Sequence, residues 1–217
     1  MEHLLYFADL FIHLDKHLDS FITLYGPLTY AILFAIVFCE TGLVVTPILP
    51  GDSLLFAAGA LAARGSLNFS LLFVLLFVAA VLGDAVNYHI GRYVGPKVFE
   101  RDSKIFKKAY LEKTQAFYEK YGGKAIIIAR FVPIVRTFAP FLAGVGKMNY
   151  AKFCSYNISG ALLWMVLLLG GGYLFGELPF VKKNFSMVVL AIIIISIMPA
   201  VVEWIKARKV ESRAKAA

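Results

Sequence analysis

The most restrictive feature of this sequence is a series of long apolar runs that contain almost no charge. Four of them extend over Leu28–Val45, Phe69–Ala85, Ile158–Phe175 and Phe185–Val202. Each is close to the roughly 20 apolar residues that an α-helix needs to cross a bilayer. The chain is 60% hydrophobic, whereas a soluble domain is about 45–50% apolar. We therefore expect an all-α polytopic integral membrane protein.

The net charge of +8 comes largely from segments that flank the apolar runs. Lysines and arginines gather in residues 96–124 and again in the tail, residues 207–217. The positive-inside rule places both segments in the cytoplasm, where basic residues also meet anionic lipid headgroups. This distribution favours membrane lipids as partners and argues against nucleic acid.

The charge pattern also limits the number of membrane crossings. Three apolar segments lie between the two basic segments, at 125–146, 158–175 and 185–202. Three full spans would put the tail on the wrong side, so one segment must enter and leave on the same face. Segment 125–146 contains Pro133 and Pro140, and proline breaks the backbone hydrogen bonding of a helix. We predict a re-entrant helix–break–helix loop there.

The first half of the chain predicts the same design with opposite orientation. The stretch PILPGD interrupts an apolar run, so residues 45–63 are predicted to form a second re-entrant loop from the other face. The predicted fold is thus an inverted repeat with two opposed re-entrant loops, about four full spans and an N-terminal amphipathic helix. The expected segments are an interfacial helix at 1–26, a first half at 27–95, a basic amphipathic segment at 96–124, a second half at 125–206 with one loop and two spans, and the tail at 207–217.

A short internal similarity supports the repeat. The tetrapeptide FAAG at Phe56–Gly59 follows the first break, and FLAG at Phe141–Gly144 follows the second. Each half then continues to a glycine pair, Gly91 with Gly95 and Gly172 with Gly176. Opposed repeats with broken helices are the plan of many transporters, in which the breaks build the substrate site.

Four charged residues interrupt the apolar segments: Glu40, Asp52, Arg130 and Arg136. One charge at the bilayer centre costs roughly 2.5–3.5 kcal/mol, so we expect the four to meet in one polar cavity. Two guanidinium groups near helix N-termini would bind a phosphate. Simpler roles stay open: Asp52 as a helix N-cap, Glu40 as a buried counter-ion, and Arg130 extending to the interface.

A second polar group is expected on one helix face, since Asp84, Tyr88 and Arg92 are spaced at four-residue intervals. We interpret it as a structural clamp or a cytoplasmic gate. Structural roles are also predicted for residues at the two breaks: Pro47, Pro50, Gly51, Pro133 and Pro140. No phosphate-binding glycine loop, cysteine–histidine metal motif or hydrolase triad is evident, so we expect no cofactor, no metal and no enzymatic activity.

The ordered motifs resemble those of the bacterial DedA family, within the wider group that shares the SNARE-associated or VTT domain. They are a glutamate in the first span, PILPGDSLL, GDAVNYHIGR and ARFVPIVRTFAPFLAG, covering Glu40 to Gly176. Two long stretches look close to the family's founding member. The resemblance implies an inner-membrane transporter, and it implies that Glu40, Asp52, Arg130 and Arg136 are functional.

Three functions follow as hypotheses. The first is translocation of an anionic lipid, undecaprenyl phosphate or a phospholipid, coupled or not to the proton motive force and supporting envelope integrity. The second is a proton-coupled ion or drug antiporter, and the third is a non-transporting scaffold for export or cell division. The sequence leaves proton coupling and the oligomeric state open, a homo-oligomer included.

Overall fold

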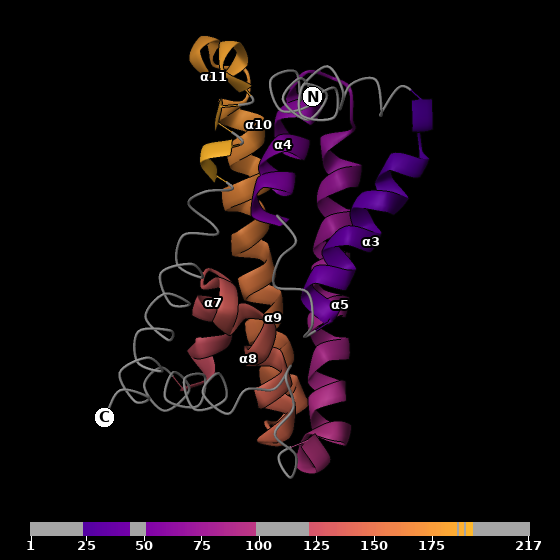
Figure 1. Cartoon of the computed structure of the whole chain (residues 1–217), viewed down its shortest axis with the longest axis vertical. Helices are drawn as coiled ribbons and strands as arrows, with labels where there is room; N and C mark the ends of the chain where they lie inside the picture. The colour runs from indigo at the N-terminus through magenta and orange to yellow at the C-terminus, as the bar shows by residue number, and fades with distance from the viewer. Residues whose placement is uncertain (1–23, 44–50, 99–121, 186, 189, 193–217) are drawn as a thin grey trace, which may run out of the picture.

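The computed structural model describes residues 24–43, 51–98, 122–185, 187–188 and 190–192, and every regular element in them is helical (Figure 1). The expected all-α class is confirmed for this part of the chain. The elements are α3 (Leu28–Gly42), α4 (Gly51–Ala63), α5 (Phe69–Val98), a 3-10 turn (Gly122–Lys124), α7 (Ala125–Ala129), α8 (Pro133–Val145), α9 (Tyr150–Met165), a π-helical turn (Val166–Gly170), α10 (Gly171–Phe175) and α11 (Pro179–Lys183).

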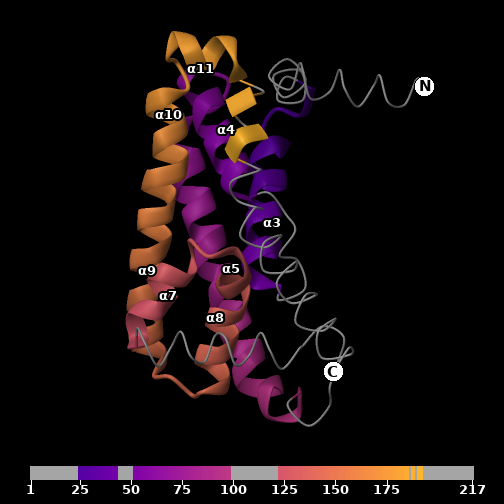
Figure 2. The same cartoon turned by 60° about the vertical axis from the view of Figure 1, so that its left-hand side comes forward.

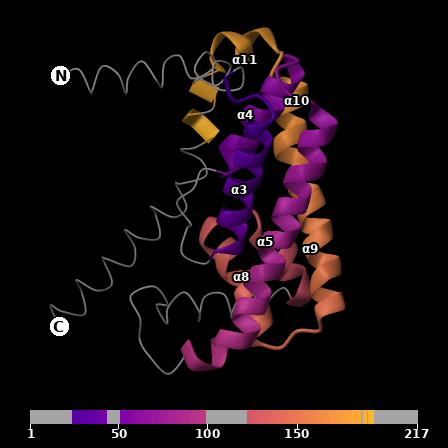
Figure 3. The ribbon, with the colours of Figure 1, turned by 90° about the vertical axis from the view of Figure 1, so that its right-hand side faces the viewer.

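Two helical segments are long and apolar enough to cross a membrane. They are Phe69–Val94 within α5 and the continuous stretch Tyr150–Phe175, each 26 residues long. At about 1.5 Å per residue, either one exceeds the roughly 30 Å hydrocarbon core of a bilayer. Figures 2 and 3 show them side by side along the long axis of the molecule, and the Asn157 side-chain amide donates a hydrogen bond to the Val81 carbonyl between them.

Each long helix starts at an asparagine. The Asn68 Oδ1 atom accepts a hydrogen bond from the Leu71 backbone N–H, and Asn149 Oδ1 accepts one from Lys152. These side chains satisfy backbone donors that a helix start leaves unpaired. The second helix therefore begins at Tyr150, eight residues before the apolar run that predicted it.

The shorter helices α4 and α8 lie in opposite halves of the molecule, α4 beside α10 and α8 beside the C-terminal part of α5 (Figure 1). A Cβ atom at Gly172 would collide with the Phe56 carbonyl of α4, and one at Gly91 would collide with the Phe141 carbonyl of α8. The tetrapeptide of each half thus packs on the glycine of the other half. This crossed contact explains why the FAAG and FLAG tetrapeptides and the two glycines recur together in both halves.

A sharp break separates α7 from α8, as proline predicts. Val132 is extended, with φ −117° and ψ 104°, and Pro133 then occupies the first turn of α8. Proline disfavours helical geometry in the residue before it, but its fixed φ suits a helix start. The helix–break–helix pattern expected between residues 125 and 146 is therefore present, with Pro133 at the break. Pro140, which was also predicted at a break, lies inside α8 instead.

The number of spans and the re-entrant course of the two loops stay predictions. Two helical segments meet the length for a span. Helix α3 ends at Gly42, whereas the apolar run that predicted it continues to Val45, and the predicted last span, Phe185–Val202, lies mostly outside the described residues. Pro47, Pro50, almost all of the predicted interfacial helix and most of residues 96–124 also lie outside them. The predicted domain boundaries are accordingly untested.

A candidate site built from two buried ion-pair clusters

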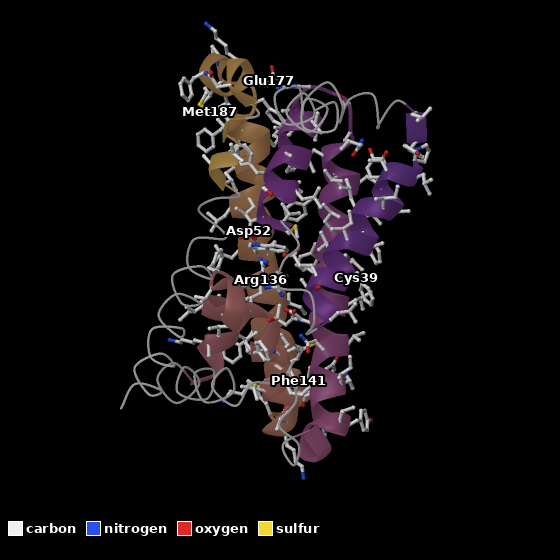
Figure 4. All side chains as sticks on the ribbon, in the orientation of Figure 1. Cys39, Asp52, Arg136, Phe141, Glu177 and Met187 are labelled. Atoms are coloured by element: carbon white, nitrogen blue, oxygen red, sulfur yellow. The ribbon has the colours of Figure 1, made fainter. Side chains whose placement is uncertain are left out.

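Arg136 holds two carboxylates with the two ends of its guanidinium group. Its Nη1 atom donates to Asp52 Oδ1 at 2.8 Å, and its Nη2 atom donates to Glu40 Oε1 at 2.5 Å. Glu40 and Arg136 are both buried, with 1% and 8% of their surface exposed. Figure 4 shows Asp52 and Arg136 facing one another midway along the molecule. The planar fork of arginine is suited to such a two-sided contact.

The start of α4 explains why both acids lie here. A Cβ atom at Gly51 would collide with the Glu40 carboxylate, so this glycine lets the carboxylate approach the helix backbone. Asp52 lies in the first turn of the same helix. The partial positive charge of a helix N-terminus favours anions, so the position stabilises both carboxylates before Arg136 is considered.

Arg136 arrives from the first turns of α8, four positions after the extended residue Val132. The N-terminal ends of α4 and α8 therefore meet at the Asp52–Arg136 ion pair. An arginine near a helix N-terminus opposes the helix dipole, and the two carboxylates offset that cost. Three of the four predicted charges are thus brought together as expected.

The fourth, Arg130, has a different partner from the one expected. It lies at the end of α7, forms an ion pair with Asp84 of α5, and donates from Nη2 to Asn157 Oδ1 at 2.7 Å. Its side chain is 2% exposed, so it does not extend to the interface. We expected the four charges to form one cluster in which Glu40 and Asp52 pair with both arginines. The structure corrects this expectation, because Arg130 pairs with Asp84.

The structure also divides the second polar group that the spacing on α5 predicted. Asp84 joins Arg130, whereas the Tyr88 hydroxyl donates to the Met148 carbonyl and accepts a hydrogen bond from Arg92 Nη1 at 3.2 Å. Tyr88 and Arg92 thus tie α5 to the turn before α9. A clamp and a gate both remain compatible with this contact.

Tyr88→Phe is expected to lower the free energy of unfolding by about 1–2 kcal/mol, since the partly buried Met148 carbonyl loses its donor. Unfolding of the purified protein in detergent, followed by circular dichroism, measures the change. If the contact is only a clamp, transport per folded molecule is unchanged. Slower transport at full folding indicates a gate.

Sequence reasoning missed three residues that complete the two clusters. The Asn157 side-chain oxygen accepts a hydrogen bond from Arg130, and the Asn87 side chain of α5 donates to the backbone carbonyls of Thr41 and Thr137. Trp164 of α9 lies beside both arginines: the Arg130 and Arg136 guanidinium carbons are 5.6 and 5.5 Å from its ring centroid. Asn87 lies two residues after the apolar run Phe69–Ala85, and Asn157 lies one residue before the run Ile158–Phe175, so neither interrupts a run. Nothing in the sequence distinguished Trp164 either.

The clusters retain unused hydrogen-bonding capacity. Arg130 Nε and Nη1 and Arg136 Nε are buried and find no hydrogen-bond partner within the part of the chain that the structure describes. Guanidinium groups with spare donors suit a phosphate or carboxylate ligand. The described residues contain no group of three metal-ligating side chains, and Cys39 and Cys154 are not joined in a disulfide.

Comparison with known proteins gives consistent matches over most of the chain. A family model described as the VTT domain matches residues 49–174. Protein DedA of Escherichia coli K12 is 54% identical over 217 residues, covering 99% of each chain. An uncharacterized membrane protein of Mycobacterium tuberculosis H37Rv is 46% identical over 173 residues, 78% of this chain and 76% of its own. The Escherichia coli inner membrane protein YqjA is 36% identical over 170 residues, 76% of this chain and 77% of its own. No solved structure matches.

Proposed function

Because this chain belongs to the DedA family of VTT-domain membrane proteins, we propose that it translocates an anionic lipid across the bacterial inner membrane. Undecaprenyl phosphate and anionic phospholipids are the candidate substrates. The proposal includes a cytoplasmic tail, which its basic residues support through the positive-inside rule.

The observation that carries the proposal is the position of Arg136, held by two carboxylates where two helix N-termini meet. Arginine N–H groups that bind carboxylate oxygens also bind phosphate oxygens well. In the proposed cycle the headgroup replaces one or both acids on Arg136, and the helix N-termini add their partial positive charge. When the headgroup leaves, Glu40 and Asp52 return to Arg136 and keep it paired.

Charge balance suggests that protons take part. With Asp84 included, the clusters hold three acids and two arginines, a formal charge of −1. An anionic headgroup entering this site adds further negative charge to a buried region, and burying unpaired charge is expensive. Uptake of a proton by one carboxylate on loading would offset that cost.

The same charge excess favours a second candidate function, a proton-coupled cation or drug antiporter in which the carboxylates bind the substrate. In that mechanism Arg136 is a counter-ion that the cation displaces. The two functions differ in what crosses the membrane, so transport of a small cation without lipid movement would favour the antiporter.

Reconstitution into liposomes tests the proposal. Flipping of labelled undecaprenyl phosphate and of an anionic phospholipid is measured, with phosphatidylcholine as the zwitterionic comparison. Arg136→Ala is expected to slow flipping at least 10-fold, as removal of a hydrogen bond to a charged group predicts. Lys152→Ala, which removes an exposed cation at the start of α9, is the control. Equal rates for Arg136→Ala and wild type on both anionic lipids would refute the proposal. A change in the flipping rate when an uncoupler is added would report proton coupling.

A further inference from the structure

Trp164 has contacts that a core tryptophan does not need. It is 1% exposed and lies on α9 among apolar side chains. Yet its Nε1–H group donates to Asp52 Oδ1 at 3.0 Å, the same oxygen that accepts a hydrogen bond from Arg136 Nη1 at 2.8 Å. One carboxylate oxygen thus has two donors, of which one is charged and the other is neutral.

The ring of Trp164 contacts the charges as well. The guanidinium carbons of Arg130 and Arg136 lie over it, at 5.6 and 5.5 Å from the ring centroid. This distance is within the range of a cation–π contact, which is strongest on tryptophan. Trp164 therefore contacts both ion-pair clusters, although it carries no charge itself.

We propose that Trp164 is a positioning residue that holds Asp52 in place while Arg136 exchanges its carboxylates for the anionic headgroup. This inference rests on the proposed function of the Arg136 site. When Arg136 turns to the headgroup, Asp52 loses a charged donor but keeps the indole N–H. The carboxylate stays oriented, so it can recapture Arg136 when the headgroup leaves.

The consequence is a specific kinetic signature. The indole N–H lowers the barrier for exchange and touches neither the headgroup nor the membrane in this scheme. Its removal is expected to slow turnover and to leave the concentration of lipid at half-maximal rate nearly unchanged. A purely structural role would instead reduce the amount of folded protein and leave turnover per folded molecule intact.

Trp164→Phe is the decisive variant, because phenylalanine keeps an aromatic face for the guanidinium groups and lacks the N–H donor. All variants carry Trp204→Phe, which removes the other tryptophan of the chain. In the liposome assay, Trp164→Phe is expected to lower the maximal flipping rate about 10-fold, the loss typical of one hydrogen bond to a charged group. Trp164→Leu, which also removes the aromatic face, is expected to lower the rate further.

The outcomes separate the two proposals. If the parent protein moves no anionic lipid, the proposed function fails. If the parent moves lipid and Trp164→Phe matches its rate per folded molecule, only the role of Trp164 fails.

Fluorescence provides a test that requires no substitution at Trp164 itself. In the Trp204→Phe protein the emission comes from Trp164 alone, so liposomes with undecaprenyl phosphate are expected to change it relative to phosphatidylcholine liposomes. An unchanged emission at lipid concentrations that saturate flipping would overturn the inference. A change that Arg136→Ala abolishes supports it.

Discussion

Asp84→Asn is expected to lower the free energy of unfolding by about 3–5 kcal/mol, the range for breaking a buried ion pair by removing one partner. Arg130 would keep its charge in a site where its side chain is only 2% exposed. Asn157 would remain as a neutral acceptor, which cannot replace a carboxylate. Equilibrium unfolding of the purified protein in detergent or nanodiscs measures the loss.

A matched pair of variants shows whether charge is the cause. The double variant Asp84→Asn with Arg130→Gln removes both charges and is expected to recover most of the stability, because it leaves no uncompensated ion. Glu177→Gln removes an acid whose side chain is 43% exposed and lies 3.9 Å from Arg64; we expect it to cost less than about 1 kcal/mol. If Asp84→Asn is as mild as Glu177→Gln, the Arg130–Asp84 pair is not an important stabilising contact.

The two arginines consequently have different surroundings, and we infer different tasks. Arg130 is held by an acid and an amide from two long helices, α5 and α9. It lies at the break before α8, so this contact anchors the start of α8. Arg136, on α8 itself, faces Asp52 at the N-terminus of α4 and Glu40 of α3. A fixed break before α8 and an Arg136 guanidinium with two carboxylate partners would allow Arg136 to exchange a carboxylate for a headgroup.

Local sequence rules predicted the parts of the fold that depend on neighbouring residues. Apolar runs predicted the helices, Pro133 predicted the break, and bilayer energetics predicted that Glu40, Asp52 and Arg136 would meet. In each of these cases the reason acts within one segment or follows from the cost of unpaired charge in lipid. The glycine similarity between the halves was also visible, although its crossed pairing was not.

The partners of Arg130 and the position of Trp164 could not be predicted in the same way. Arg130 is 46 residues from Asp84 and 27 from Asn157, and Trp164 is 112 residues from Asp52. Charge balance alone is satisfied equally well by Glu40, Asp52 or Asp84, so the choice depends on how the helices cross. For Trp164 no local pattern separates an indole that packs in the core from one that also holds a carboxylate.

Gly172→Ala is expected to destabilise the protein by about 1–3 kcal/mol or more, the cost of inserting a methyl group into a closely packed interface. The new Cβ atom would meet the carbonyl oxygen of Phe56, and it would lie 2.9 Å from the carbonyl carbon and 3.0 Å from the Cα atom of the same residue. These are backbone atoms of α4, which cannot rotate away, so α4 and α10 must move apart. Close approach at small residues is a main source of helix association in membranes.

The adjacent residue provides the control. A Cβ atom at Gly171 meets nothing within 4 Å, and alanine favours helix by about 1 kcal/mol over glycine, so Gly171→Ala is expected to be neutral or slightly stabilising. Gly91→Ala, which would collide with the Phe141 backbone in the other half, is expected to cost about as much as Gly172→Ala. Thermal unfolding of the three variants in the same detergent measures these differences in stability. Equal stability of Gly171→Ala and Gly172→Ala would mean that the crossed helix contacts are not close-packed. Equal losses of stability in Gly91→Ala and Gly172→Ala would show that both halves depend on the same kind of glycine contact.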